Sequence, residues 1–513
     1  MNSRRHRPPR RPLDQTRALS RGKALIHRIP EETQVDLKLF GILAAIVCCL
    51  AILVEKETQL PKGVLLMAGA LGIGGLLISA FRSPNLPVYA LTVYLPFNRV
   101  LVGDFGGGVT ALNLTNILVG ILLISWLSTG RKKENKFWTK SPLGIPVFLF
   151  AMAGALSLVT AASTFGSHYL SRYIFELKRW LDPLFIYYIV YNTVRNKKVI
   201  KHLTLIIGFT VTVVAAMAIK DYIDVGQVSS LEKSRIGGIA EQPNILGTFF
   251  CYYMFLLAAF WITNIKRLSA WGLLVPFLMC FRGIMVTFSR GAYLAFACGG
   301  MALTWFRSKI IFGILIFYIV AAMSNPVLLP SGIRYRMDQT WQNKQSTSYV
   351  DQSQADLEAS ADTRLKIWRG AFLMIQDYPL TGVGYGLFDD YIPQYAPDLR
   401  GAIDAHNQYL LIAGEMGIPA LLIFLWILFI IWWKTRYLYH HAKDPFIKSM
   451  ALGWLAGLAG VLIGNLFGSR LHSMEISGYF WILSALVMRA ITLEKQEAAH
   501  NTPPAPQPRR TPR

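Results

Sequence analysis

Long apolar stretches recur along the whole chain and are separated by short polar gaps. A helix needs about 20 mainly apolar residues to cross a bilayer, and about fourteen stretches approach or exceed that length. They lie near 38–54, 63–81, 86–102, 111–128, 143–162, 180–193, 202–219, 244–264, 269–288, 291–306, 309–325, 407–432, 448–466 and 477–491. The pattern predicts an all-α polytopic membrane protein with about 12–14 transmembrane helices.

Positive charge gathers in alternate gaps and in the two tails. The chain has 52 Lys and Arg against 29 Asp and Glu, which gives a formal net charge of +23. When the first tail is placed in the cytoplasm, every inner gap carries at least one Lys or Arg, as cytoplasmic loops do. We therefore interpret the basic excess as a topology signal with affinity for the lipid bilayer and its anionic headgroups. Nucleic acid is not a predicted partner.

The same alternation divides the chain into five segments. We predict a basic cytoplasmic tail at 1–37, transmembrane helices at 38–325, a large outer loop at 326–406, further transmembrane helices at 407–491 and a disordered cytoplasmic tail at 492–513. The predicted outer gaps are 55–62, 103–110, 163–179, 220–243, the turn at 289–290, 326–406 and 467–476.

The unusual polar residues of the chain fall in the outer gaps. Arg235 lies in a Gly-containing loop ahead of a helix that we expect to open at Pro243. Arg290 lies in a short turn between two apolar runs, and Arg364 lies in an amphipathic segment of the large loop. His406 stands where that loop meets the next apolar run. Because Arg close to a bilayer is costly unless it is paired or functional, these residues predict a site at the outer face.

This combination of residues suits transfer chemistry on a lipid-linked pyrophosphate. Arginine presents a planar fork of donors that binds phosphate oxygens in a bidentate way. Fixed cations stabilise the negative charge that develops on a pyrophosphate leaving group. A histidine at the water edge can take a proton from an incoming hydroxyl group. The residues therefore indicate transfer of a sugar from a lipid pyrophosphate carrier to an acceptor hydroxyl.

The order of these motifs resembles the O-antigen ligase and Wzy-type polymerase family over roughly residues 200–490. The motifs are Arg235 with Pro243-Asn244, the turn Ser289-Arg290-Gly291, Arg364 followed by Trp368, Gly382-Val383-Gly384, and His406-Asn407 ahead of Glu415-Met416-Gly417. The resemblance implies an inverting glycosyltransferase without a metal or other cofactor. It also implies an undecaprenyl-pyrophosphate-linked glycan donor, a lipid or glycan acceptor, and a site on the periplasmic face of the bacterial inner membrane. The outer loop would then be periplasmic.

The resemblance further implies roles for individual residues. Arg235, Arg290 and Arg364 would bind pyrophosphate or sugar, and His406 would activate the acceptor. We predict that Asn407 joins the substrate-binding set, with helix capping as its alternative. Arg282 lies eight residues before Arg290, and this spacing predicts a shared helix face that deepens the same cationic pocket. Pairing of Arg282 with a backbone carbonyl is the equal alternative. Ligase, polymerase and protein glycosylation remain open as activities.

Several residues have simpler interpretations. The alternative interpretation of the arginines is that they are solvated loop cations or side chains that reach lipid headgroups. Glu415 follows His406 by nine residues, about two and a half helical turns, so we expect a packing or hydrogen-bonding role for it. Asp404 is close enough to orient His406. Asp389 and Asp390 are adjacent on an expected extended loop and would point to opposite faces, which disfavours a metal site.

The competing class of function is a transporter or flippase for polysaccharide or lipid-linked glycan. Such folds are often built from internal repeats with binding sites near the membrane midplane. The sequence shows no convincing repeat between its halves, and its polar clusters sit at one membrane face. These features favour an interfacial enzyme.

Overall fold

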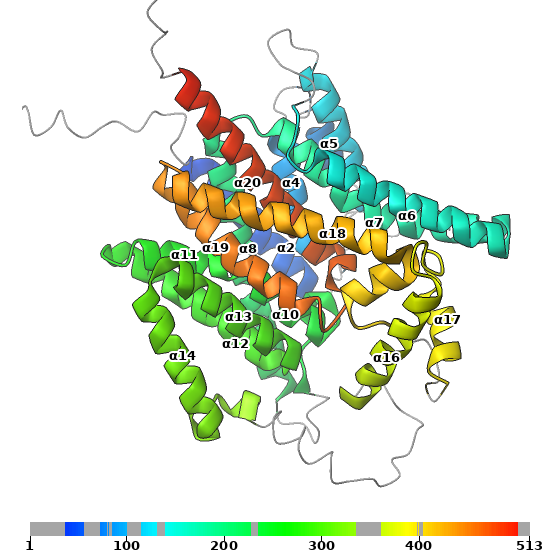
Figure 1. Cartoon of the computed structure of the whole chain (residues 1–513). Helices are drawn as coiled ribbons and strands as arrows, with labels where there is room; N and C mark the ends of the chain where they lie inside the picture. Colours follow the sequence, from blue (N-terminus) through cyan, green and yellow to red (C-terminus); the bar gives the residue numbers. More distant parts are fainter. Residues whose placement is uncertain are drawn as a thin grey trace, which may run out of the picture.

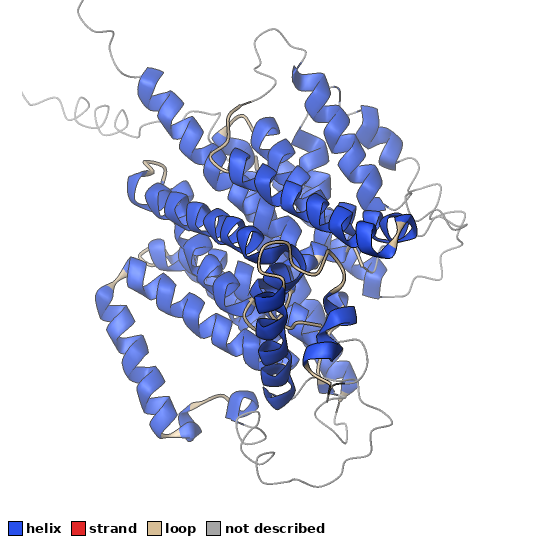
Figure 2. Ribbon diagram, turned by 45° about the vertical axis from the view of Figure 1, so that its right-hand side comes forward, coloured by secondary structure: helices blue, strands red, loops and turns tan. Residues whose placement is uncertain are grey.

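The computed structural model of the chain describes residues 36–55, 72–78, 81, 85–99, 114–130, 139–226, 234–334, 361–397, 399 and 404–500. Within these ranges the secondary structure is α-helix with short 3₁₀ turns and no strand. Long helices lie side by side in one bundle, and two shorter ones, α16 and α17, lie together beyond one end of it (Figure 1, Figure 2). The predicted all-α polytopic membrane fold is thus confirmed.

The described part of the chain forms sixteen α-helices and five 3₁₀ turns. They are α2 (Leu37–Glu55), α4 (Asn85–Tyr94), α5 (Leu114–Gly130), α6 (Gly144–Phe165), α7 (Ser167–Thr193), α8 (Lys197–Val225), α10 (Pro243–Tyr253), α11 (Phe255–Thr263), α12 (Leu274–Thr287), α13 (Arg290–Arg307), α14 (Lys309–Ser324), α16 (Ala361–Asp377), α17 (Phe388–Tyr395), α18 (Gln408–His441), α19 (Pro445–Gly464) and α20 (Met474–His500). The 3₁₀ turns are η2 (Leu95–Phe97), η3 (Gly238–Ala240), η4 (Leu268–Leu273), η5 (Pro326–Leu328) and η7 (Arg470–His472).

The predicted apolar runs coincide with helices wherever the structure describes them, whereas most of 63–81 lies outside the described residues. Seven helical stretches of the described chain are long and apolar enough to cross a membrane. They are 144–165, 197–225, 243–263, 268–287, 408–441, 445–464 and 474–498. Three further apolar helices, at 37–50, 114–128 and 309–324, are shorter. The lower number reflects helix length in part, since three of the predicted runs form apolar helices of only 10–17 residues. The runs at 180–193 and 291–306 lie in α7 and α13, which are long enough but are not apolar enough to be among the seven.

Helix α20 and the α10–α11 pair form the centre of the bundle. In the apolar window of α20, 94% of the residues are buried, against 39% for α6 and for α18. Helix α19 packs closely on α10 and α11 through glycines. A Cβ at Gly457 would lie 2.2 Å from the carbonyl oxygen of Tyr252, and one at Gly453 would lie 2.7 Å from Cα of Leu256. Small residues thus bring the backbones of these membrane helices together, as is common in helix association within lipid.

Two segment boundaries differ from the sequence predictions. The predicted outer gap 163–179 is mostly helix, because α6 ends at Phe165 and α7 begins at Ser167, with Gly166 (φ 88°) between them. Tyr169 and Leu177, two turns apart on α7, are both buried, so this polar stretch is an amphipathic helix. The predicted disordered tail also begins too early, since α20 continues from 492 to His500. The predicted tails at 1–35 and 501–513 lie outside the described residues.

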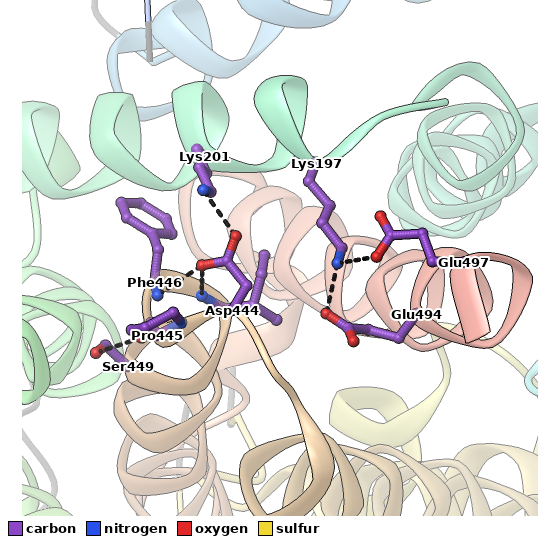
Figure 3. A network of polar contacts seen from close by, with 9 residues as sticks. Lys197, Lys201, Asp444, Pro445, Phe446, Ser449, Glu494 and Glu497 are labelled. Atoms are coloured by element: carbon purple, nitrogen blue, oxygen red, sulfur yellow. Dashed lines mark hydrogen bonds and ion pairs between the residues drawn. The ribbon is translucent and has the colours of Figure 1, made fainter. Parts of the chain in front are cut away.

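Ion pairs join three helices at the end of the bundle where α8 begins (Figure 3). Lys201 Nζ lies 2.7 Å from Asp444 Oδ2, and Asp444 also caps the first turn of α19. Lys197 Nζ lies 2.7 Å from Glu494 Oε1 and 2.6 Å from Glu497 Oε2. Both lysines are buried, so their charges depend on these carboxylates. The pairs explain why α20 continues as a helix beyond the predicted membrane run.

A glycine-rich turn of the large loop packs backbone to backbone on a kink in α18. The N–H of Gly384 donates to the carbonyl oxygen of Glu415 at 3.1 Å. Gly382 has φ 66°, and a Cβ there would lie 2.3 Å from the carbonyl carbon of Glu415. Gly417 has φ 81° at the kink, and a Cβ added there would lie 2.2 Å from the carbonyl oxygen of Leu380. Glycine is therefore required at both positions, which accounts for two of the motifs in the sequence.

Substituting Gly417→Ala is expected to destabilise the folded protein by roughly 2–4 kcal/mol, because a side chain there meets backbone and a left-handed conformation. The measurement is the thermal unfolding of the detergent-solubilised protein. The matched control is Gly313→Ala in α14, where an added Cβ meets nothing within 4 Å. Equal unfolding temperatures for the two variants would contradict the proposed packing of the loop on α18.

Candidate active site

Four arginines from distant parts of the chain line one small cavity at the end of the bundle where α10 begins. They are Arg235 ahead of α10, Arg290 at the start of α13, Arg364 on α16 and Arg470 in η7. The cavity volume is about 20 Å³, which is room for a water-sized group. The structure therefore brings together the three arginines predicted from the sequence and adds a fourth.

Arg235 is fixed in place by the ends of two helices. Its Nε donates to the carbonyl oxygen of Thr287 at 3.0 Å, and one terminal nitrogen donates to Oδ1 of Asn244 at 3.1 Å. The side chain is 9% exposed. Thr287 ends α12 and Asn244 lies in the first turn of α10, which begins at Pro243 as predicted. The guanidinium plane is thus oriented before any ligand arrives.

Arg364 and Arg470 are cations in a desolvated setting. Arg470 is 9% exposed, and one of its terminal nitrogens donates to the carbonyl oxygen of Phe467 at 3.2 Å. Burial lowers the pKa of both arginines, although guanidinium groups stay charged at any physiological pH. Nε of Arg364 is buried and has no hydrogen-bond partner among the described residues. An anion in the cavity would satisfy both the charges and this donor.

His406 forms a pair with Asp404 beside this cavity. Nδ1 of His406 lies 3.2 Å from Oδ2 of Asp404, and the His406 backbone N–H donates to Oδ1 at 3.2 Å. Desolvation works to raise the pKa of Asp404, but hydrogen bonds and electrostatic attraction from His406, together with Arg470, outweigh it and lower that pKa to about 2. Asp404 is therefore an ionised, acceptor-only group at neutral pH.

This pairing settles which nitrogen of the imidazole is basic. An ionised carboxylate only accepts hydrogen bonds, so Nδ1 of His406 is the donor and Nε2 carries the lone pair. The φ angle of His406 is 46°, a left-handed conformation that only a few per cent of non-glycine residues adopt. Ser469 Oγ donates to Asp404 Oδ1 at 3.3 Å and steadies the carboxylate from the other side. The suggestion that Asp404 orients His406 thus agrees with the geometry.

Two members of the predicted substrate-binding set lie elsewhere or are already engaged. Arg282 does not line the arginine cavity and lies over the ring of Tyr222, 5.0 Å from its centroid. The shared-face argument fails because α12 ends at Thr287 and the chain turns at Phe288 (φ 48°) before α13. Asn407 is the N-cap of α18, since its Oδ1 accepts from the N–H groups of the second and third helical residues at 2.9 and 3.2 Å.

A second and larger cavity of about 530 Å³ lies on the other side of Asp404. Asp404, Ala405 and His472 line its wall. His472 and Arg470 both come from η7, in the predicted outer gap 467–476, and sequence reasoning missed both residues. A cation and a histidine together in one outer gap were the signal that would have identified them.

The carboxylates of this region do not form a metal-binding cluster within the part of the chain that the structure describes. Asp389 and Asp390 lie in the first turn of α17, not on an extended loop as expected from the sequence. Carboxylates at a helix N-terminus are stabilised by the helix dipole, which gives this pair a structural reason. Glu415 is buried and interacts with the backbone N–H groups of Gly386 and Phe388, as its predicted hydrogen-bonding role requires.

Residues 275–425 match the model of a protein family described as O-antigen ligase. The matched segment runs from α12 into α18 and contains Arg290, Arg364, Asp404 and His406. No protein of curated function matches the chain. The resemblance to the O-antigen ligase and Wzy-type family is thereby confirmed. The match to this family supports a glycosyltransferase-type role in surface polysaccharide biosynthesis for this chain, which is a multi-pass membrane protein.

Proposed function

We propose that this chain, which carries an O-antigen ligase match over residues 275–425, transfers a glycan from an undecaprenyl-pyrophosphate donor to an acceptor hydroxyl. The observation that carries the proposal is the meeting of four arginines around one cavity beside an oriented Asp404–His406 pair. The lining of the arginine cavity suits phosphate oxygens of the donor, because guanidinium groups bind phosphate oxygens strongly and with defined geometry.

In the proposed reaction His406 is the general base. Nε2 of His406 takes the proton of the acceptor hydroxyl while that oxygen attacks the anomeric carbon of the donor sugar. The bond between the anomeric carbon and the pyrophosphate oxygen breaks, and undecaprenyl pyrophosphate leaves with the bonding electrons. Attack opposite to the leaving group inverts the anomeric configuration. Asp404 stabilises the imidazolium that forms, as the carboxylate of a catalytic triad does.

The arginines supply the electrostatic stabilisation of the step. Charge grows on the pyrophosphate as the glycosidic bond breaks, and preorganised donors aimed at that charge lower the barrier. Four guanidinium groups at one cavity can provide the positive charge that a divalent cation provides in other transferases. We therefore propose a metal-independent reaction.

We place the reaction on the periplasmic face of the inner membrane. The lysines at the start of α8 lie at one end of the bundle, where they form the ion pairs shown in Figure 3. Helix α19 begins with Asp444 as its N-cap at that end and finishes at Gly464, which lines the arginine cavity. A helix of 20 residues is about 30 Å long, the thickness of the hydrocarbon core. The positive-inside rule assigns the lysine-rich end to the cytoplasm, so the cavity faces outward.

The transporter alternative has less support from the geometry. The polar cavities lie at one end of the bundle, next to α16 and α17, whereas transporter sites lie near the midplane at broken helices. An interfacial enzyme needs its polar groups where a lipid headgroup and an aqueous acceptor meet.

The glycan profile of a bacterial strain that lacks the protein tests the proposed function. Loss of long surface glycans with single repeats retained would identify a polymerase. Complete chains that accumulate on the lipid carrier would identify a ligase. Restoration by the wild-type gene, and not by a His406→Ala gene, is the control. An unchanged profile of both surface and carrier-linked glycans would contradict the proposal.

A further inference from the structure

The larger cavity beside Asp404 has a lining that differs sharply from that of the arginine cavity. Its volume of about 530 Å³ falls within the range of about 300–1,000 Å³ that is usual for small-molecule sites. Its walls come from α7, from the glycine-rich turn with α17, and from the start of α18 with η7. The two cavities meet at the η7 turn, since Arg470 lines the arginine cavity and His472 lines the larger one.

One wall of the larger cavity is aromatic and firmly held. The rings of Tyr169 and Tyr173 are stacked, with centroids 4.3 Å apart and an interplanar angle of 23°. Tyr169 Oη donates to the carbonyl oxygen of Tyr385 at 2.6 Å, which ties α7 to the glycine-rich turn. A Cβ at Gly386 would lie 2.7 Å from the Tyr173 ring, so glycine lets the turn approach that ring. Tyr173 and Tyr385 both line the cavity.

The charged groups of the lining are mostly carboxylates. Four acidic residues line the cavity: Glu176, Asp389, Asp404 and Glu415. One guanidinium, that of Arg172, also lines it and lies 5.3 Å over the Tyr173 ring. Ionised carboxylates accept hydrogen bonds and do not donate them, so they suit ligand hydroxyl groups. They also repel anionic ligands at close range. The lining therefore favours a neutral molecule that is rich in hydroxyl groups.

A sugar ring combines the two properties that this lining selects. Its ring carbons present an apolar face that can lie on an aromatic side chain, and its rim carries hydroxyl donors. An aromatic wall with a few placed polar groups is the usual composition of a site that fixes ligand orientation. The position also fits, because Asp404, which pairs with His406, lines this cavity and does not line the arginine cavity.

We propose that the cavity between α7, the glycine-rich turn and η7 binds a neutral saccharide of the acceptor. Tyr173 supports the sugar face, while Asp389 and Glu176 accept its hydroxyl groups. This assignment rests on the proposed transfer reaction, in which the acceptor hydroxyl must enter opposite to the pyrophosphate. It predicts that the acceptor end of the substrate carries no uronic acid or phosphate at the bound sugar.

Direct binding tests the assignment without relying on turnover. The purified full-length protein in lipid nanodiscs is applied to a microarray of neutral and acidic microbial surface glycans. We expect binding to neutral glycans, weakened about tenfold by Asp389→Asn, as the loss of a hydrogen bond to a charged group implies. Tyr173→Ala should weaken it by about the same factor, because it removes the ring that supports the sugar face. The control is Phe175→Ala on the same helix, which is 55% exposed and does not line the cavity.

Binding of farnesyl pyrophosphate, measured in parallel, reports whether each variant keeps the arginine cavity intact. Retained pyrophosphate binding by a variant that has lost glycan binding supports the assignment. The assignment is overturned if the wild-type protein binds no neutral glycan, if it prefers acidic glycans, or if both cavity variants bind as Phe175→Ala does. Neutral glycan binding by a protein that transfers no glycan would instead contradict the proposed reaction and leave the saccharide site standing.

Discussion

Replacing His406 by alanine is expected to lower turnover about 10²–10⁴-fold, the usual contribution of a positioned general base. Donor binding is expected to persist, because the arginine cavity does not include the imidazole. The measurement pairs the rate of glycan transfer with equilibrium binding of a polyprenyl pyrophosphate. Asp404→Asn should fall between the wild type and His406→Ala, since it leaves Nε2 in place but removes the charge that fixes the tautomer.

The matched control for the base is His441→Ala. His441 lies in the last turn of α18, at the opposite end of that helix, and contacts the backbone of Tyr437. Its loss should leave turnover near the wild-type value. Wild-type turnover of the His406→Ala variant would remove His406 from the mechanism. Loss of donor binding in that variant would mean that the residue holds the cavity together and does not act as the base.

Replacing Arg364 or Arg470 by lysine is expected to lower turnover about 10–10²-fold although the charge is kept. A lysine ammonium is a point charge and does not reproduce the bidentate fork of the guanidinium. Both side chains are desolvated, so an imperfect fit cannot be repaired by bulk water. The change should appear mainly in kcat, because the interaction strengthens as the leaving group gains charge. Steady-state kinetics at varied donor concentration separates kcat from KM.

Arg282→Lys is the matched control for the arginine variants. Arg282 is exposed, lies over Tyr222 and does not line the cavity, so this variant should transfer glycan at nearly the wild-type rate. Wild-type rates in both the Arg364→Lys and the Arg470→Lys variant would mean that these arginines stabilise the fold or set the membrane topology and do not assist the reaction. Equal loss in Arg282→Lys would mean that the loss does not depend on position in the cavity.

The hydrophobic pattern predicted the fold well because a bilayer imposes a simple rule of length and polarity on each helix. It failed where tertiary contacts extend a helix beyond its apolar run. Residues 167–179 are helical because alternate turns bury Tyr169 and Leu177. Residues 492–500 are helical because Glu494 and Glu497 on this segment pair with Lys197. Those partners lie far away in the sequence, so no local pattern predicts that the helices continue.

The candidate site was predictable in part for the same reason. Arg235 and Arg290 lie next to apolar runs and Arg364 lies in the large loop, all in predicted outer gaps, so the predicted sidedness already puts them near one another. Arg470 was missed because the signal in its gap, a cation beside a histidine, was not weighed. Arg282 was misplaced because a spacing of eight residues indicates a shared face only along an unbroken helix, and the turn at Phe288 breaks it.

Transfer by the purified protein in proteoliposomes tests the central claim most directly. The substrate is an undecaprenyl-pyrophosphate-linked glycan from the producing strain, and the products are followed with and without EDTA. We expect an extended or ligated acceptor, free undecaprenyl pyrophosphate in equal amount, an inverted anomeric configuration by NMR, and no effect of EDTA. Absence of transfer, retention of configuration, or loss of activity in EDTA that a divalent ion restores would contradict a metal-independent transferase built on His406 and the four arginines.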